Sequence, residues 1–171
     1  MIKESLVQRF ETSILTQGDS VHIAMCLKRG GGKVAFADLC RESFADGTPY
    51  IYLEQMRAEQ QYRGQGLASS LIETVNRYLL DKHLFGFLFN IARGTSPIYD
   101  IHTRKLLDIQ DFYSRHGWQY VTDCANNSLA EQYYKRYVPE ECCVYMFFNP
   151  GYDNAFEQRM VNMFIENMLK L

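Results

Sequence analysis

The stretch Gln60-Gln61-Tyr62-Arg63-Gly64-Gln65-Gly66-Leu67-Ala68 separates a segment with the pattern of a strand from a segment with the pattern of a helix. The residues before it, 50–58 (YIYLEQMRA), are rich in apolar and aromatic side chains that favour a strand. The residues after it, 67–80, carry apolar side chains at helical spacing, so we expect an amphipathic helix. The apolar positions of this helix are Leu67, Leu71, Ile72, Val75 and Leu79.

The predicted strand has two faces, because successive side chains of a strand point to opposite sides. One face carries Tyr50, Tyr52, Glu54, Met56 and Ala58, and the other carries Ile51, Leu53 and Gln55.

A tight glycine turn between a strand and a helix directs unpaired backbone N–H groups outward, and the helix dipole adds a partial positive charge. Gly64 and Gly66 let the backbone approach ligand oxygens without a Cβ, and Arg63 adds a charge-assisted contact. A P-loop is excluded because Leu67-Ala68 stand where Lys-Ser/Thr would be needed, and Ser69 breaks the three-glycine dinucleotide fingerprint. The glycines alone fit an ordinary strand-to-helix turn as well as a diphosphate site.

Length, composition and charge narrow the kind of protein that this chain can be. The chain has 171 residues, 47% hydrophobic and 22% charged, which suits one domain or a domain with an appendage. Its net charge of −2 gives no general attraction to nucleic acid or to an anionic membrane. The five cysteines form no C-x-x-C pair, so we expect reduced thiols and no metal site. Without a signal segment or a long apolar run, we expect a cytoplasmic location.

The order of the remaining segments predicts an α/β (α+β) domain with a mixed central sheet flanked by helices. Two strands joined by a glycine turn come first, then strands and helices follow. The segments are strands at 21–28, 34–39, 84–92, 118–122 and 143–148, a loop at 93–101, helices at 103–116 and 154–170, and a helix or long loop at 126–139; residues 5–15 fit either a strand or a helix. We expect residues 1–150 to form the main domain and residues 151–171 a C-terminal amphipathic helix.

Two motifs resemble signatures of the GNAT family of N-acetyltransferases. Arg63 to Ala68 is similar to the family's acyl-CoA-binding pattern, Gln/Arg-x-x-Gly-x-Gly/Ala. Phe112 to Trp118 is similar to its second signature, in which an aromatic pair and a charged turn precede a glycine and an aromatic residue. The resemblance covers about residues 20–123 and implies a mostly antiparallel GNAT-like sheet.

The resemblance also implies a cofactor and the residues that hold it. Acetyl-CoA would be the co-substrate, with its pantetheine arm along a strand and its pyrophosphate on backbone amides of the turn. An amine would attack the thioester directly, with no covalent enzyme intermediate. The implied cofactor-binding residues are Met56, Arg57, Ala58, Arg63, Gly64, Gln65, Gly66, Leu67, Ala68 and Ser69. Leu106 stands where the family commonly has an asparagine, so one cofactor contact is not provided.

The candidate catalytic residues are Tyr113 and Glu54. Tyr113 matches the family tyrosine that protonates or hydrogen-bonds the leaving thiolate, although its position alone predicts a core aromatic residue. Tyr52 stands where several members have a glutamate base, so Glu54, two residues further on, is the proposed base. A surface or ion-paired strand carboxylate explains Glu54 equally well, and Asp100 and His102 are alternative bases.

These residues imply an N-acetyltransferase for a primary amine of a peptide, a protein or a small molecule. A catalytically weak module that binds CoA or a protein partner is the alternative, and an unrelated nucleotide-binding domain is a third. The C-terminal helix carries an apolar stripe that either folds back on the sheet or forms an interface, including that of a homodimer. The stripe consists of Phe156, Met160, Met163, Phe164 and Met168.

Overall fold

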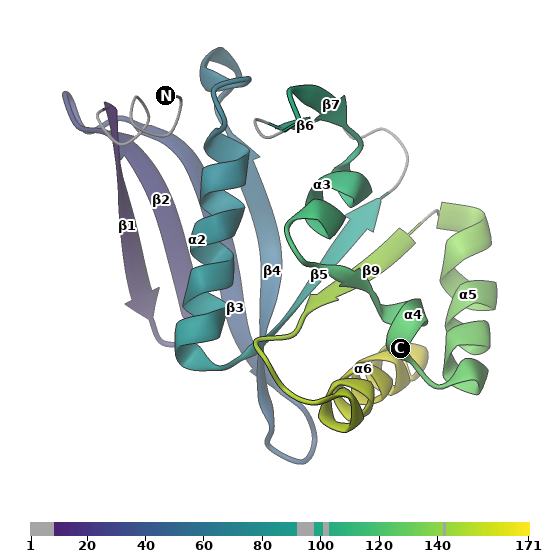
Figure 1. The fold of residues 1–171 in the computed structure, drawn as a ribbon. Helices are drawn as coiled ribbons and strands as arrows, with labels where there is room; N and C mark the ends of the chain where they lie inside the picture. The colour runs from purple at the N-terminus through teal and green to yellow at the C-terminus, as the bar shows by residue number, and fades with distance from the viewer. Residues whose placement is uncertain (1–8, 92–97, 101–102, 142) are drawn as a thin grey trace.

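The computed structural model describes residues 9–91, 98–100, 103–141 and 143–171. A twisted seven-stranded sheet in the order β1-β2-β3-β4-β5-β9-β8 forms the centre of the molecule (Figure 1). Among the described strands of this sheet, β4 and β5 run parallel and the other neighbours are antiparallel. The predicted mixed, mostly antiparallel fold is therefore confirmed. The strands are β1 Phe10–Gln17, β2 Ser20–Leu27, β3 Lys33–Ser43, β4 Pro49–Ala58, β5 Phe85–Ile91, β8 Gln119–Tyr120 and β9 Cys143–Phe148.

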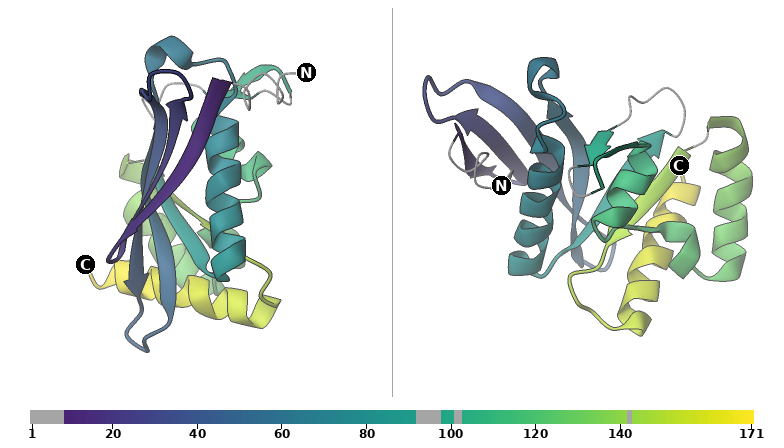
Figure 2. Two further views of the ribbon diagram at one scale, coloured as in Figure 1. Left: turned by 90° about the vertical axis from the view of Figure 1, so that its left-hand side faces the viewer. Right: turned by 45° about the horizontal axis from the view of Figure 1, so that its top comes forward.

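Helices cover both faces of the sheet (Figure 2). The long helix α2, Leu67–Lys82, and the short helix α3, Ile109–Arg115, share a buried cluster with one face. The helices α4, Val121–Cys124, α5, Asn127–Glu141, and α6, Asn154–Leu169, share a second cluster with the other face. A one-turn helix, η1 Gln60–Tyr62, precedes α2, and β6, Ile98–Asp100, pairs with β7, Lys105–Leu107, in a separate small sheet.

The first core holds α2 and α3 against the sheet at a close approach around Gly86. A Cβ at this position of β5 would lie 2.6 Å from Leu79 and 2.9 Å from Trp118, so only glycine fits there. The Trp118 indole N–H donates to Asn76 Oδ1 (2.9 Å), and Asn76 Nδ2 donates to the His116 carbonyl (2.8 Å). These bonds satisfy the polar edge of a buried indole and tie the turn after α3 to α2.

The second core receives the apolar stripe of α6. The Phe164 ring stacks on Phe87 of β5 with centroids 4.1 Å apart, and Met160 and Met168 are also buried. Asp153 caps the helix, because its Oδ1 accepts from the Phe156 N–H (2.8 Å). The apolar face of α6 thus packs on the protein's own sheet. No helix among the described residues combines the length and apolar character needed to cross a bilayer.

Several predicted segments differ from the structure. The helix predicted at 103–116 begins only at Ile109, because residues 105–107 pair with β6 and Asp108 caps the helix by accepting from the Asp111 N–H (2.8 Å). Part of the predicted loop at 93–101 therefore belongs to β6, while residues 93–97 and 101 lie outside the described residues. The strand predicted at 118–122 covers only Gln119–Tyr120, since Val121 starts α4 and is buried there. The ambiguous segments resolve as strand β1 and helix α5.

Candidate active site

The parallel strands β4 and β5 separate partway along their length (Figure 1). They pair from Tyr50 to Leu53 of β4 and from Phe85 to Leu88 of β5. Beyond Leu88, β5 remains paired with β9, while β4 remains paired with β3 as far as Ala58. The edge of β4 from Glu54 to Ala58 thus has no pairing with β5 in the described structure. A free strand edge offers backbone N–H and C=O groups to an extended ligand.

A β-bulge marks the point where β4 leaves β5. Leu53 pairs with Leu39 and Gln55 pairs with Asp38, so Glu54 is the extra residue. The bulge resets the alternation of side chains. Met56 and Ala58 pack against the same core as Ile51 and Leu53, whereas Tyr50 and Tyr52 belong to the second core. The prediction that Met56 and Ala58 share a face with the two tyrosines was therefore wrong.

The turn after β4 has the backbone form that its glycines predicted. Gly64 and Gly66 have φ angles of 78° and 81°, in the left-handed region that favours glycine. The helix α2 begins directly after Gly66, with no side-chain cap and no acidic residue in its first turn. By contrast, α3 and α6 are capped by Asp108 and Asp153. The N-terminus of α2 therefore presents its first amides and its positive dipole end without an internal anion.

The surroundings of Ser69 bear on whether the turn fits a phosphate group. Ser69 is fully buried, and its Oγ has no hydrogen-bond partner among the described residues. A buried hydroxyl without a partner costs about 1–3 kcal/mol. A ligand oxygen at the first turn of α2 would remove that cost. The turn is also uncrowded, because a Cβ at Gly64 would meet nothing within 4 Å. The residues therefore fit the pyrophosphate of CoA.

Two arginines lie beside the turn. Arg63 Nε donates to the Ala58 carbonyl (3.4 Å), so its side chain turns back along the end of β4. Arg9 Nη1 donates to Gln65 Oε1 (3.4 Å), and its guanidinium lies 5.5 Å from the centre of the Phe10 ring. Sequence reasoning missed Arg9, because no local pattern connects β1 with a turn 56 residues away.

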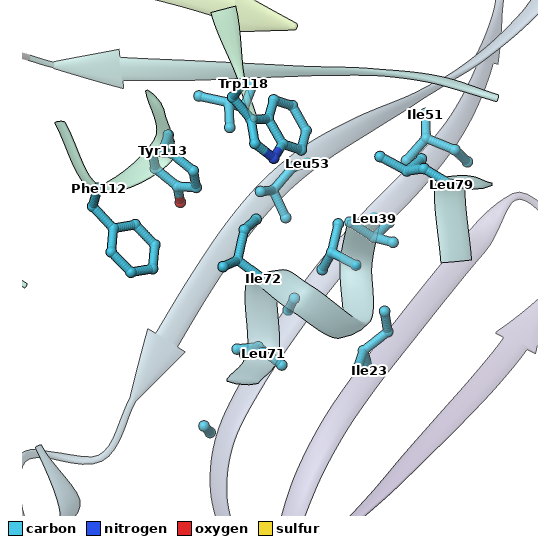
Figure 3. Packing of buried hydrophobic residues seen from close by; sticks show 14 of the residues in the cluster. Ile23, Leu39, Ile51, Leu53, Leu71, Ile72, Leu79, Phe112, Tyr113 and Trp118 are labelled. Atoms are coloured by element: carbon cyan, nitrogen blue, oxygen red, sulfur yellow. The ribbon is translucent and has the colours of Figure 1, made fainter. Parts of the chain in front are cut away.

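Tyr113 is buried in the first core, in the cluster that contains Leu53 and Ile72 (Figure 3). Its ring packs edge-on against Trp118, with centroids 6.1 Å apart. Burial raises the pKa of Tyr113 far above its ordinary value, so the phenol stays protonated. No described residue hydrogen-bonds to its hydroxyl. The structure thus places Tyr113 in the core on the α2 side of the sheet.

Glu54 is exposed and lies on the side of Tyr52. Burial, followed by the charges of Glu42 and Glu54, raises the pKa of Tyr52. Burial and the same two carboxylates also raise the pKa of the Cys40 thiol, with Asp19 as a smaller cause. The carboxylate of Glu54 is therefore close to both groups, on the opposite side of the sheet from Tyr113.

A polar network adjoins Glu54 that sequence reasoning missed. His22 Nδ1 lies 2.5 Å from Asp38 Oδ1, and Gln55 Nε2 donates to Asp38 Oδ2 (2.6 Å). Burial raises the pKa of Asp38, but hydrogen bonds from His22 and Gln55 outweigh it, so the pKa lies below its usual value. The signal was weak but present, because His22 and Asp38 occupy opposed positions in the predicted hairpin.

The side chains of the two alternative bases are not described by the structure, so both stay predictions. His102 lies outside the described residues, and the backbone of Asp100 pairs with Lys105 in the small sheet. Leu106 pairs with Tyr99 in that sheet and is not part of α3. Within the described ranges, no three His, Cys, Asp or Glu side chains are grouped to hold a metal ion.

Comparisons with known proteins agree with this architecture. No model of a known protein family matches the chain. A thialysine N-epsilon-acetyltransferase from Sus scrofa is 32% identical over 68 residues, which are 40% of this chain and 39% of that protein. Among solved structures, a proposed acyl-CoA N-acyltransferase from Klebsiella pneumoniae has a TM-score of 0.51 at 17% identity, over 80% of this chain and 77% of its own. The ribosomal-protein-S18-alanine N-acetyltransferase from Escherichia coli has a TM-score of 0.49 at 14% identity, over 89% and 88% of the two chains.

The likeness to the Klebsiella pneumoniae structure confirms the GNAT-like acyl-CoA N-acyltransferase fold that the two motifs predicted. The matched segment spans less than half of the pig protein. The activity and the substrate of the pig protein therefore do not carry over to this chain.

Proposed function

We propose that the chain is an N-acetyltransferase that transfers an acetyl group from acetyl-CoA to a primary amine of a peptide, a protein or a small molecule. The observation that carries the proposal is the edge of β4 that no described strand pairs with beyond Leu53, which leads directly into the uncapped N-terminus of α2. An extended arm followed by a diphosphate is the ligand that such a combination suits.

The cofactor-binding residues follow the chain from β4 into α2. The backbone of Met56, Arg57 and Ala58 would pair with the amides of the pantetheine arm. The amides from Gly64 through Ser69 would hold the pyrophosphate, with the Ser69 hydroxyl as a further donor. Arg63 and Arg9 add positive charge beside the turn. When bound, acetyl-CoA supplies the thioester that the amine attacks.

Tyr113 is the proposed acid. As the amine nitrogen bonds to the acyl carbon, the carbon–sulfur bond breaks and negative charge develops on sulfur. The phenol of Tyr113, whose pKa burial raises further above neutrality, keeps its proton and can donate a hydrogen bond to that sulfur. Its buried site excludes water, which strengthens such a bond. The nitrogen loses its second proton as the amide forms, and the sulfur gains one proton by way of Tyr113 or water, so CoA leaves as a neutral thiol.

Glu54 is the proposed base. The acceptor ammonium must lose a proton before it attacks, and an exposed carboxylate beside the opening of β4 and β5 can receive it, directly or through water. Because Glu54 and Tyr113 lie on opposite sides of the sheet, we infer that the acceptor arrives on the Tyr52 side. The carboxylates of Glu42 and Asp38 on that side favour a cationic acceptor.

The test combines binding with turnover. Native mass spectrometry of the chain with acetyl-CoA and with ATP should show binding of acetyl-CoA alone. A panel of peptide N-termini, lysine analogues and small amines should then release CoA thiol together with a product heavier by one acetyl group. Binding without any turnover would favour the catalytically weak module. Leu106, which stands in place of the family's cofactor-contacting asparagine, provides a reason for weak catalysis. Absence of acetyl-CoA binding would contradict both.

A further inference from the structure

A hollow of about 300 Å³ lies at the far end of α2 from the cofactor turn. It is formed where α2 ends, where β4 and β5 begin, and where α6 starts. The helix has 16 residues, so at 1.5 Å per residue roughly 24 Å separate this hollow from the glycine turn. It is therefore distinct from the turn proposed to hold the pyrophosphate.

The rim of the hollow is cationic. Arg41 of β3 and Lys82 of α2 line it, and no acidic residue in the described part of the chain does. Within the described part of the chain, neither side chain has an ion pair. Asp46, in the turn just before the hollow, is already bound to Arg159 (2.7 Å). Two cations that line one concavity, with no carboxylate in its described lining, favour a local positive potential, although the chain as a whole has a net charge of −2.

The helix dipole explains why a lysine lies at the end of α2, but it does not explain why Arg41 lies beside the same hollow. A cation in the last turn complements the helix dipole. However, the backbone N–H groups of His83 and Leu84 already satisfy the carbonyls of Leu80 (3.1 Å) and Leu79 (3.0 Å). Arg41 comes from a different element and has no such role.

One wall of the hollow is a fixed aromatic stack. The Tyr152 ring lies 4.1 Å from the His83 ring and 4.1 Å from the Phe156 ring, centroid to centroid. The Tyr152 hydroxyl donates to the His83 carbonyl (3.0 Å), which holds the tyrosine against the end of α2. His83 itself is left-handed, with a φ of 54°, a conformation that is unfavourable for a side chain with a Cβ. Buried Met160 contributes to the apolar lining.

We propose that this hollow binds a small organic anion with a planar ring, of the class of aromatic carboxylates. Arg41 and Lys82 would hold the carboxylate, and the ring would lie against Tyr152 and Phe156. The volume has room for about ten groups of the size of a water molecule, which matches a single ring with one carboxylate. The proposal does not depend on acyl transfer, because it uses none of the residues assigned to that site.

Benzoate is the probe that tests it. In NMR titrations of the whole chain, benzoate should shift the backbone amide signals of residues 82–85 and 152–156 in a saturable way. Benzamide, which lacks the charge, and inorganic phosphate, which lacks the ring, should bind more weakly. Arg41→Gln and Lys82→Gln should each weaken benzoate binding about tenfold, the loss expected for one charge-assisted contact.

Lys135→Gln on α5 is the matched control, because it removes an exposed lysine outside the hollow and should leave benzoate affinity unchanged. Circular dichroism should show that all three variants are folded. Equal binding of benzamide and benzoate, or unchanged affinity in Arg41→Gln and Lys82→Gln, would overturn the site. Phosphate that binds as tightly as benzoate would overturn the assignment of a ring-bearing ligand.

Discussion

At the scale of single residues, Tyr113 and Glu54 differ most in their surroundings. Tyr113 is 5% exposed and lies in an apolar core, whereas Glu54 is exposed at a bulge. A buried phenol suits a hydrogen-bond donor to sulfur, and an exposed carboxylate suits exchange of protons with water. The assignment of acid and base follows from these two environments, and both roles stay predictions.

Removal of the Tyr113 hydroxyl should affect turnover and not binding. We expect Tyr113→Phe to lower kcat by roughly 10²–10⁴-fold, the range for loss of a general acid, with little change in acetyl-CoA affinity. Steady-state kinetics with calorimetry would measure both. Tyr120→Phe is the control, because it removes a nearby hydroxyl that donates to Gln110 (3.3 Å). Equal activity of Tyr113→Phe and Tyr120→Phe would mean that Tyr113 has a structural role and is not the acid.

Neutralisation of Glu54 tests the base. We expect Glu54→Gln to lower kcat by roughly 10²–10⁴-fold, since the amide keeps the size of the side chain but cannot accept the proton. Glu59→Gln, which changes another exposed glutamate just beyond β4, should keep full activity. If both variants retain wild-type rates, the base lies elsewhere, and the His22–Asp38 pair becomes the next group to change.

At the scale of elements, the long helix α2 begins with neither a side-chain cap nor an acidic residue in its first turn. Where α3 and α6 use an aspartate, α2 has only Gly66. An internal carboxylate at this point would compete with a ligand phosphate for the same amides. The absence of a cap thus costs the helix some stability and leaves its dipole end open to an anion.

A negative charge in the glycine turn should weaken cofactor binding. We expect Gly64→Asp to lower acetyl-CoA affinity by at least tenfold, because the carboxylate would repel the pyrophosphate. Gly30→Asp is a matched control: both glycines have a positive φ, 78° and 90°, and a Cβ at either position meets nothing within 4 Å. The backbone strain of the two substitutions is therefore comparable, and the two sites differ in that Gly64 alone lies in the turn proposed to hold the pyrophosphate. Calorimetry that finds equal affinity in the two variants would contradict the placement of the pyrophosphate.

At the scale of the whole molecule, α6 completes the second core. The stack of Phe164 on Phe87 joins the C-terminal helix to the central strand β5. The face of the sheet that α6 covers would otherwise expose Phe85, Phe87 and Phe147. The C-terminal segment therefore contributes to the stability of the sheet, and a homodimer through this helix would have to use its remaining exposed side.

Truncation of Phe164 should destabilise the whole domain. We expect Phe164→Ala to lower the free energy of unfolding by about 3–5 kcal/mol, because it leaves a cavity under a well-packed ring. Urea unfolding would measure the loss. Glu166→Ala on the exposed side of the same helix should change stability by less than about 0.5 kcal/mol. A small effect of Phe164→Ala would mean that α6 packs loosely on the sheet.

The sequence by itself determined the segment from β4 through α2, because its signals are local. Side-chain periodicity defines the strand and the helix, and the positive φ angles of Gly64 and Gly66 need only the chemistry of glycine. Two such local motifs in the right order were enough to predict the fold and to propose Tyr113 and the cofactor-binding turn. The Gly117 turn after α3 was equally predictable, with a φ of 86°.

Only the tertiary structure decided the features that join distant parts of the chain. The bulge at Glu54 arises from the register between β3 and β4, so strict alternation in the sequence could not place Met56 and Ala58. The contact of Arg9 with Gln65, the pairing of His22 with Asp38 and the hollow between Arg41 and Tyr152 all need strands and helices to be assembled first. Each depends on cross-strand register and helix packing, which a local pattern of residue types does not encode.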